Sequence, residues 1–143
     1  MKRKHIAEIR AFNRFYTSII GLLDQHILES RYSLPEVRIL YELYYSDQLT
    51  ASDITGSLRI DKGYLSRMLL RFQKKKLVSK KWSAQDGRAA HLSLTEKGKM
   101  EFEALNEASN RQIKKILDKT TVPDCNKLVR HMTGIMTILS KTK

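Results

Sequence analysis

The fold is decided by residues 50–94, which read TASDITGSLRIDKGYLSRMLLRFQKKKLVSKKWSAQDGRAAHLSL. Thr50 with Asp53, and then Asp61, are helix-starting residues, because their side-chain oxygens accept bonds from the free N–H groups of a first helical turn. Only residues 59–61 separate the two helices that these caps begin, which indicates a helix-turn-helix. The apolar side of the second helix consists of Leu65, Met68, Leu69 and Phe72.

The apolar spacing then changes from a helical period to a period of two. Val78, Lys80 and Trp82 alternate with Ser79, Lys81 and Ser83, and Leu92 and Leu94 flank Ser93. Residues 84–88 lie between these segments and contain an Asp-Gly pair, which is typical of a tight turn. The sequence therefore predicts a β-hairpin, or wing, directly after the helix-turn-helix.

Further helices are expected on both sides of this stretch. Apolar residues at helical spacing predict one long amphipathic helix over 5–28, and Ser33 with Glu36 form a capping box for the next helix. That helix is expected to bury Val37, Leu40, Tyr41 and Tyr44. Two more helices are expected at about 95–119, through Phe102, Leu105, Ile113 and Ile116, and from Val122 onward, through Leu128, Met132, Ile135 and Leu139. The expected fold is mainly α, a winged helix-turn-helix of about six helices with a small β-hairpin, in a single domain over 1–143.

Charge is concentrated on the helix-turn-helix and the hairpin. The 143 residues carry a formal net charge of +12, from 27 Lys and Arg against 15 Asp and Glu. Between Arg59 and Lys99, twelve bases face three acids, a balance of +9. A positive field of this kind favours nucleic acid first and an anionic membrane surface second. A solvated lysine surface is the plain alternative, particularly for Lys74–Lys76.

Composition narrows the class of protein. The single cysteine, Cys125, excludes a disulfide framework and fits a reducing cytoplasm. No apolar run is long enough for a membrane span, and no signal peptide is expected. The four histidines (His5, His26, His91 and His131) are scattered, so no metal site and no cofactor are expected. No nucleophile–base pair or phosphate-cradling loop indicates an enzyme. Cys125 is expected to be buried or inert and not a thiol sensor. Trp82 is expected to pack on the hairpin and not to serve as a platform on which bases stack.

The second helix of the helix-turn-helix has the residue types that a DNA-reading helix needs. Lys62, Gly63, Tyr64, Ser66 and Arg67 are small, polar or basic and lie away from Leu65 and Leu69. Such residues allow a helix to enter the major groove and reach base edges. Arg71 and Lys74 suit phosphates, which position a protein without reading sequence. Arg88 at the hairpin tip is placed for an adjacent minor groove, with Asp86 as its charge-assisted partner.

These residues resemble the MarR-type winged helix-turn-helix regulators. Residues 61–67 (DKGYLSR) look like the recognition helix, and Asp86-Gly87-Arg88 followed by Leu94-Thr95-Glu96-Lys97-Gly98 matches the wing signature and the start of the next helix. The resemblance covers nearly the whole chain. One departure is Lys76, where the family usually has a glycine that closes the recognition helix. Lys76 is therefore expected to adopt the left-handed conformation at a small cost, or to force another cap.

The resemblance implies a homodimer with interleaved terminal helices. The apolar stripes of the first and last expected helices support this independently, since exposed stripes usually find a partner. The expected division is a DNA-binding lobe at 33–97, with 5–30 and 98–141 as the helical dimerisation region. Relatives bind small phenolic or carboxylate ligands between these parts, where Phe15, Tyr41, Tyr44 and Tyr45 are the candidate effector residues; core packing explains these aromatic residues equally well. A twofold dimer implies a pseudo-palindromic operator.

A finer resemblance concerns residues 9–16 (IRAFNRFY) and 64–67 (YLSR), which look like the MarR-like half of proteins that also carry a GNAT-type acetyltransferase half. The chain ends at Lys143, so it is either a stand-alone relative or part of a longer protein. Two hypotheses follow. The leading one is a cytoplasmic, dimeric, sequence-specific double-stranded DNA-binding repressor released by a small-molecule effector. The alternative is a winged-helix regulatory or protein-binding module of an acetyltransferase system.

Overall fold

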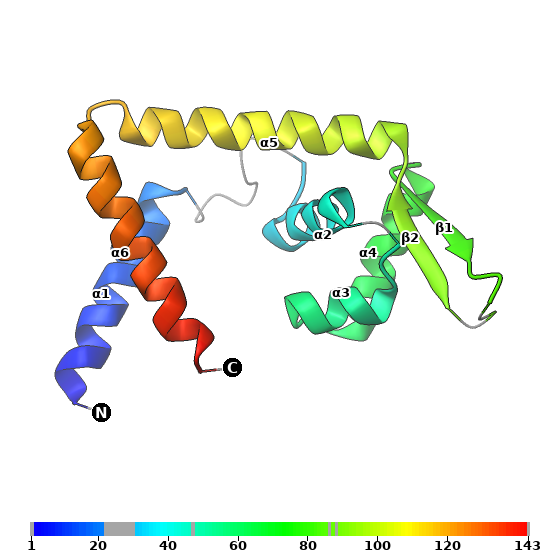
Figure 1. Cartoon of the computed structure of the whole chain (residues 1–143), viewed down its shortest axis with the longest axis horizontal. Helices are drawn as coiled ribbons and strands as arrows, with labels where there is room; N and C mark the ends of the chain where they lie inside the picture. The colour runs from blue at the N-terminus through cyan, green and yellow to red at the C-terminus, as the bar shows by residue number, and fades with distance from the viewer. Residues whose placement is uncertain (1, 22–30, 47, 86, 88, 143) are drawn as a thin grey trace. The chain divides into compact units, whose positions relative to one another are not determined.

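A computed structural model describes residues 2–21, 31–46, 48–85, 87 and 89–142. Its elements are α1 (Arg3–Ile19), α2 (Leu34–Tyr45), α3 (Ala51–Leu58), α4 (Lys62–Lys74), β1 (Val78–Trp82), β2 (Ala90–Leu94), α5 (Glu96–Leu117) and α6 (Val122–Ser140). Two compact units divide the chain, Met1–Ser109 and Asn110–Lys143. Within the first unit, α2, α3, α4 and the hairpin form a winged helix-turn-helix (Figure 1). The expected mainly α fold with one small hairpin is confirmed.

The predicted caps begin the helices of this lobe. In α2 the Ser33 side chain accepts from the backbone N–H of Glu36, whose carboxylate accepts from the Ser33 N–H. Thr50 and Asp53 make the same reciprocal pair at α3. The hydrogen bond from the Thr50 N–H is the main reason that the pKa of the Asp53 carboxyl is lowered. At α4 the Asp61 carboxylate accepts from the Tyr64 N–H at 2.9 Å. These side chains satisfy N–H groups that the helices themselves leave free.

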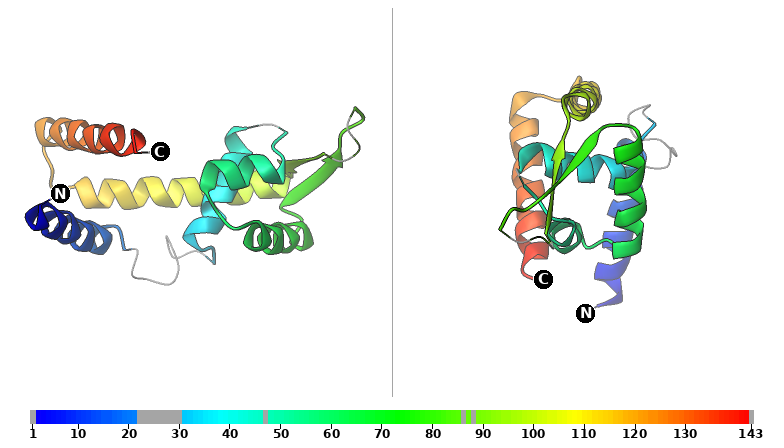
Figure 2. Two further views of the ribbon diagram at one scale, coloured as in Figure 1. Left: turned by 90° about the horizontal axis from the view of Figure 1, so that it is seen from below. Right: turned by 90° about the vertical axis from the view of Figure 1, so that its right-hand side faces the viewer.

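The helix-turn-helix has the expected connection and the expected buried side. Residues 59–61 join α3 to α4, and Arg59 takes the left-handed conformation (φ 52°) that turns the chain there. Figure 2 shows α3 and α4 beside the hairpin, which projects past them. The core cluster includes the whole predicted stripe of α4, Leu65, Met68, Leu69 and Phe72.

The hairpin is antiparallel and is joined to the helical part of the lobe. Val78 pairs with Leu94 at its base and Trp82 with Ala90 near its tip. The Leu92 N–H donates to the Leu49 carbonyl at 2.8 Å, so the segment before α3 adds a bridge to the edge of β2. This bond holds the wing against the helix-turn-helix.

A compact junction links α4, β1 and α5. Lys76 takes the left-handed conformation (φ 59°), which is the first of the two outcomes expected for a lysine in place of the usual glycine. The Thr95 hydroxyl donates to the Lys76 carbonyl at 2.6 Å and accepts from the Gly98 N–H. A Cβ on Gly98 would lie 3.0 Å from the carbonyl carbon of Leu77 and closer still to its oxygen. Gly98 therefore allows α5 to begin directly against the start of β1.

Two sequence predictions were wrong in detail. The first helix ends at Ile19 instead of continuing to residue 28, because Gly21 takes a positive φ of 68°, which stops helical winding; residues 22–28 lie outside the described residues. The prediction for α2 was right for Leu40, which is buried, but Tyr41 is exposed, and Val37 and Tyr44 are only half-buried against the core. The core lies further toward Ile39 and Leu43 than the apolar spacing indicated. The residues that α2 buries are Glu36, Ile39, Leu40 and Leu43.

Candidate nucleic-acid interface

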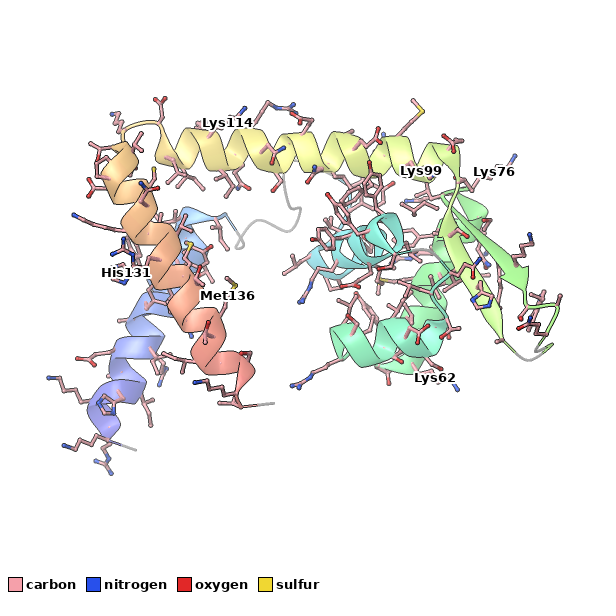
Figure 3. All side chains as sticks on the ribbon, viewed as in Figure 1. Lys62, Lys76, Lys99, Lys114, His131 and Met136 are labelled. Atoms are coloured by element: carbon pink, nitrogen blue, oxygen red, sulfur yellow. The ribbon has the colours of Figure 1, made fainter. Side chains whose placement is uncertain are left out.

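One side of α4 is exposed and basic, opposite the buried side. The exposed residues of this face are Lys62, Gly63, Ser66, Arg67, Leu70, Arg71 and Lys74. They recur at helical spacing, so they lie along one side of the helix. Lys62 begins α4, and Lys76 follows its other end (Figure 3). Of the residues predicted to reach DNA from α4, Tyr64 alone is half-buried, and it packs against the core.

The beginning of this face has little room for a larger side chain. A Cβ on Gly63 would lie 3.1 Å from the Asp61 carboxylate that caps the helix and 3.5 Å from an Nη atom of Arg67. The guanidinium of Arg67 therefore lies beside the backbone of the first turn. Because Gly63 has no side chain, its backbone is exposed at the start of α4 beside the Arg67 guanidinium.

The Arg71 guanidinium has a partner that sequence reasoning missed. Its Nη2 donates to the Glu36 carboxylate at 2.7 Å, and the other oxygen of this carboxylate accepts from the Ser33 N–H at 2.8 Å. The Glu36 side chain is 11% exposed, whereas that of Arg71 is 59% exposed. Glu36 thus joins the start of α2 to the exposed face of α4. The capping box identified Glu36, but nothing local in the sequence indicates its second partner.

The wing contributes further positive charge. Lys80 and Lys81 are exposed on β1, and the Lys80 ammonium lies 5.3 Å from the ring centre of Trp82. Trp82 is itself exposed and lines a cleft of about 420 Å³ between the hairpin and the start of α3. Asp86 and Arg88, predicted for the minor groove, lie outside the described residues.

Three of the four candidate effector residues gather around α5. The rings of Tyr41, Tyr44 and Tyr45 lie 4.5–6.1 Å, centre to centre, from the ring of Phe102. The Tyr44 hydroxyl donates to the Glu103 carboxylate at 2.9 Å, and this bond raises the pKa of Tyr44. The ring contacts of the described residues do not include Phe15, which lies exposed on α1. From the sequence, Phe102 was predicted only as an apolar position of the helix that became α5.

The described residues contain no group of three or more His, Cys, Asp or Glu that could hold a metal ion. Over the same ranges, none of the helices combines the length and the apolar character needed to cross a membrane. Cys125 is half-buried near the start of α6.

A capped two-helix turn, an exposed basic second helix and a following hairpin define a winged helix-turn-helix protein. Residues 32–90 match the family model described as "MarR family". The matched segment covers α2, α3, α4 and β1, which is the part of the chain whose motifs resemble this family.

One curated protein and several solved structures are also similar to this chain. The chain is 25% identical over 97 residues to the uncharacterized HTH-type transcriptional regulator YdgJ of Bacillus subtilis (strain 168), a match over 68% of this chain and 59% of that protein. Its fold is similar to that of Streptococcus pneumoniae FabT in complex with DNA (TM-score 0.79, 19% identity, 99% of this chain and 100% of that one). It is also similar to Bordetella bronchiseptica BpsR, whose structure concerns regulation of DNA binding by 6-hydroxynicotinic acid (TM-score 0.68, 16% identity, 89% and 96%).

Proposed function

We propose that this protein is a dimeric, sequence-specific double-stranded DNA-binding transcriptional regulator, a cytoplasmic repressor released by a small-molecule effector. The observation that carries the proposal is the exposed basic face of α4, which lies opposite the core stripe within the segment matched by the MarR model. A helix with this arrangement fits the major groove of B-DNA. The DNA complex of FabT, a protein of the same fold, supports this use of the fold.

Each residue of the interface has a proposed role. Lys62, Gly63, Tyr64, Ser66 and Arg67 approach base edges, because they lie at the beginning of α4. Arg71 and Lys74, in its last turn, contact phosphates. In this arrangement Glu36 holds one edge of the Arg71 guanidinium, and the other edge donates to DNA. Arg88, supported by Asp86, enters the adjacent minor groove.

Dimerisation through the terminal helices is supported by their exposed apolar residues. None of the described residues of α1 or α6 is buried in the single chain. The large exposed apolar residues of these helices are Ile6, Ile9, Phe12, Phe15 and Ile19, and Val122, Leu128, Val129, Ile135, Met136, Ile138 and Leu139. We propose that a second copy covers them, with 5–30 and 98–141 as the dimerisation region and 33–97 as the DNA-binding lobe. The twofold axis then places two α4 helices about one DNA turn apart on a pseudo-palindromic operator.

The proposed effector is a small phenolic or carboxylate compound, bound beside Tyr41, Tyr44 and Tyr45. Aromatic side chains with a few polar groups are the usual lining of small-molecule sites, and the Tyr44–Glu103 pair supplies such a polar group. A compound that binds there and alters the spacing of the two α4 helices weakens DNA binding. The regulation of BpsR by 6-hydroxynicotinic acid supports this kind of partner for the fold.

Selection of duplexes from a genomic fragment library, followed by footprinting at physiological salt, tests the proposal. We expect a preferred pseudo-palindromic site whose affinity falls roughly 10³-fold or more between 50 and 200 mM salt, because several phosphates are neutralised in each half-site. Arg67→Ala should relax the sequence preference, whereas Arg88→Ala should weaken binding to several sequences alike. Lys2→Ala, at an exposed lysine before α1 that lies outside both proposed regions, is the matched control and should change neither. Absence of any preferred site would overturn the proposal.

The second candidate, a regulatory or protein-binding module of an acetyltransferase system, rests on the residues of α1 and on Tyr64–Arg67 alone. It predicts that the chain co-purifies with a separate acetyltransferase. A specific operator bound in the absence of such a partner would eliminate it.

A further inference from the structure

One exposed apolar side chain lies within the basic face of α4. Leu70 is 53% exposed, although it belongs to a helix whose other apolar residues, apart from the half-buried Tyr64, are buried. Its neighbours one helical turn away on the exposed face are Arg67 and Lys74, and Arg71 follows it in sequence. A single exposed leucine on a protein surface needs no explanation. Leu70 is different because of the face on which it lies.

The position of Leu70 is the one expected for a base-contacting side chain. The buried side of α4 is centred between Leu65 and Phe72. Because an α-helix turns through about 100° per residue, Leu70 projects about 150° away from the centre of that side. It therefore lies near the midline of the face that the proposed function directs into the major groove.

The surface beside Leu70 is hollowed. A shallow depression of about 340 Å³ is lined by Tyr64, Arg67, Met68, Leu70 and Arg71. Tyr64, Met68 and Leu70 supply apolar surface, and the two arginines border it. The depression can thus receive a small apolar group while the guanidinium groups contact polar atoms of the same bound partner.

We infer that Leu70 contacts the C5-methyl group of a thymine and thereby selects thymine next to the base read by Arg67. The inference rests on the proposed function. Among the groups that base pairs present in the major groove, the thymine methyl is the apolar one, and the remainder are hydrogen-bond donors and acceptors. An aliphatic side chain on this face gains most by burying that methyl, because hydrophobic contact requires an apolar partner.

Methyl deletion in the DNA tests the contact directly. The full chain first selects its preferred duplexes from a randomised library, and each thymine of the selected sequence is then replaced by deoxyuridine, which lacks only the methyl. We expect one position in each half-site at which this replacement weakens binding about fourfold, the amount that corresponds to one buried methyl group. Replacement in both half-sites should weaken binding roughly 15-fold if the two effects add. Fluorescence anisotropy at fixed salt measures the dissociation constants.

Protein variants identify the side chain responsible. The Leu70→Ala variant should bind the thymine duplex more weakly than the unsubstituted protein does. Because this variant no longer contacts the methyl group, it should bind the thymine and deoxyuridine duplexes with equal affinity. Leu70→Met keeps an apolar side chain of similar reach and should retain the sensitivity to the methyl. Leu34→Ala, which truncates an exposed leucine at the start of α2, is the matched control and should behave as the unsubstituted protein does.

The possible results are distinct. If the protein enriches a duplex but no deoxyuridine replacement weakens binding, or if Leu70→Ala remains sensitive to the methyl, this inference is wrong and the proposed function stands. If no duplex is enriched, the proposed function fails and this inference fails with it.

Discussion

Substitution of Gly98 by alanine should destabilise the lobe strongly. An added Cβ would lie 3.0 Å from the carbonyl carbon and 3.3 Å from the Cα of Leu77, and nearer still to the Leu77 oxygen. These are backbone atoms, so no flexible side chain can move aside. The Leu77 carbonyl also accepts from the Thr95 N–H at 3.0 Å and from the Thr95 hydroxyl at 3.2 Å. Displacing α5 from β1 would therefore strain both bonds.

The expected magnitude follows from opposing terms. Overpacking costs about 1–3 kcal/mol, and weakening two hydrogen bonds adds about 1–2 kcal/mol. Replacing glycine by alanine within a helix returns about 0.5–1 kcal/mol. The free energy of unfolding should thus fall by about 1–4.5 kcal/mol, where the upper part of the range applies if both bonds break.

Urea denaturation followed by circular dichroism measures this change, at one fixed protein concentration because the proposed dimer makes stability concentration-dependent. Gly56→Ala is the matched control. Gly56 lies inside α3, and nothing lies within 4 Å of the added Cβ. The control should therefore be more stable by about 0.5–1 kcal/mol. A Gly98→Ala variant within about 0.5 kcal/mol of the unsubstituted protein would refute this account of the α5–β1 junction.

The remaining predictions concern the backbone, an ion pair and a titrating group. Lys76→Gly should stabilise the folded protein by about 0.5–1 kcal/mol, because Lys76 has a positive φ of 59°. Lys75→Gly is the control and should destabilise the folded protein, because Lys75 has a φ of −79°. Thermal unfolding measures the stability of both variants. Glu36→Gln should lower stability by about 1 kcal/mol, since it removes the charge while keeping a capping side chain. A double-mutant cycle checks this: in an Arg71→Ala background most of the loss should vanish, and additive losses would contradict the pairing. Burial is the main reason that the pKa of Tyr32 is raised to about 12 from an ordinary value of 10.0. The neutral Tyr32 hydroxyl therefore contributes fully to the stability of the folded protein below about pH 10, and this contribution is lost as the pH rises toward about 12. Tyr32→Phe removes the titrating group, so the stability of this variant should depend less on pH in the alkaline range.

Helix starts, the hairpin and the buried side of α4 were predictable because they depend on neighbours in sequence. The Ser33 and Thr50 capping boxes and the Asp61 cap each join atoms three residues apart. The buried stripe of α4 follows from the helical repeat alone. The same local reasoning identified the exposed basic face as the candidate DNA-reading surface and Lys76 as a departure in the following turn.

Other features were not predictable, because they join residues far apart in sequence. The rotation of α2 differs from its apolar pattern, and Tyr41 remains exposed while Ile39 is buried. The helix end at Ile19 is a different case: it is local, because Gly21 with its positive φ lies only two residues further on, and sequence reasoning missed this signal. The aromatic cluster around Phe102 forms because α2 packs against α5, which lies about sixty residues further along the chain.

Sequence alone was sufficient to place the starts of the helices of the lobe, the change from helix to hairpin, and the positively charged side of α4. Each of these depends on hydrogen bonds and periodicity within a few residues. By contrast, the pairing of Glu36 with Arg71, across 35 positions, became visible only in the folded chain. The same is true of the need for a glycine at position 98, because the Leu77 backbone occupies the space that a side chain would fill. Packing brings these groups together, and local pattern carries no information about which distant backbone or carboxylate will be adjacent.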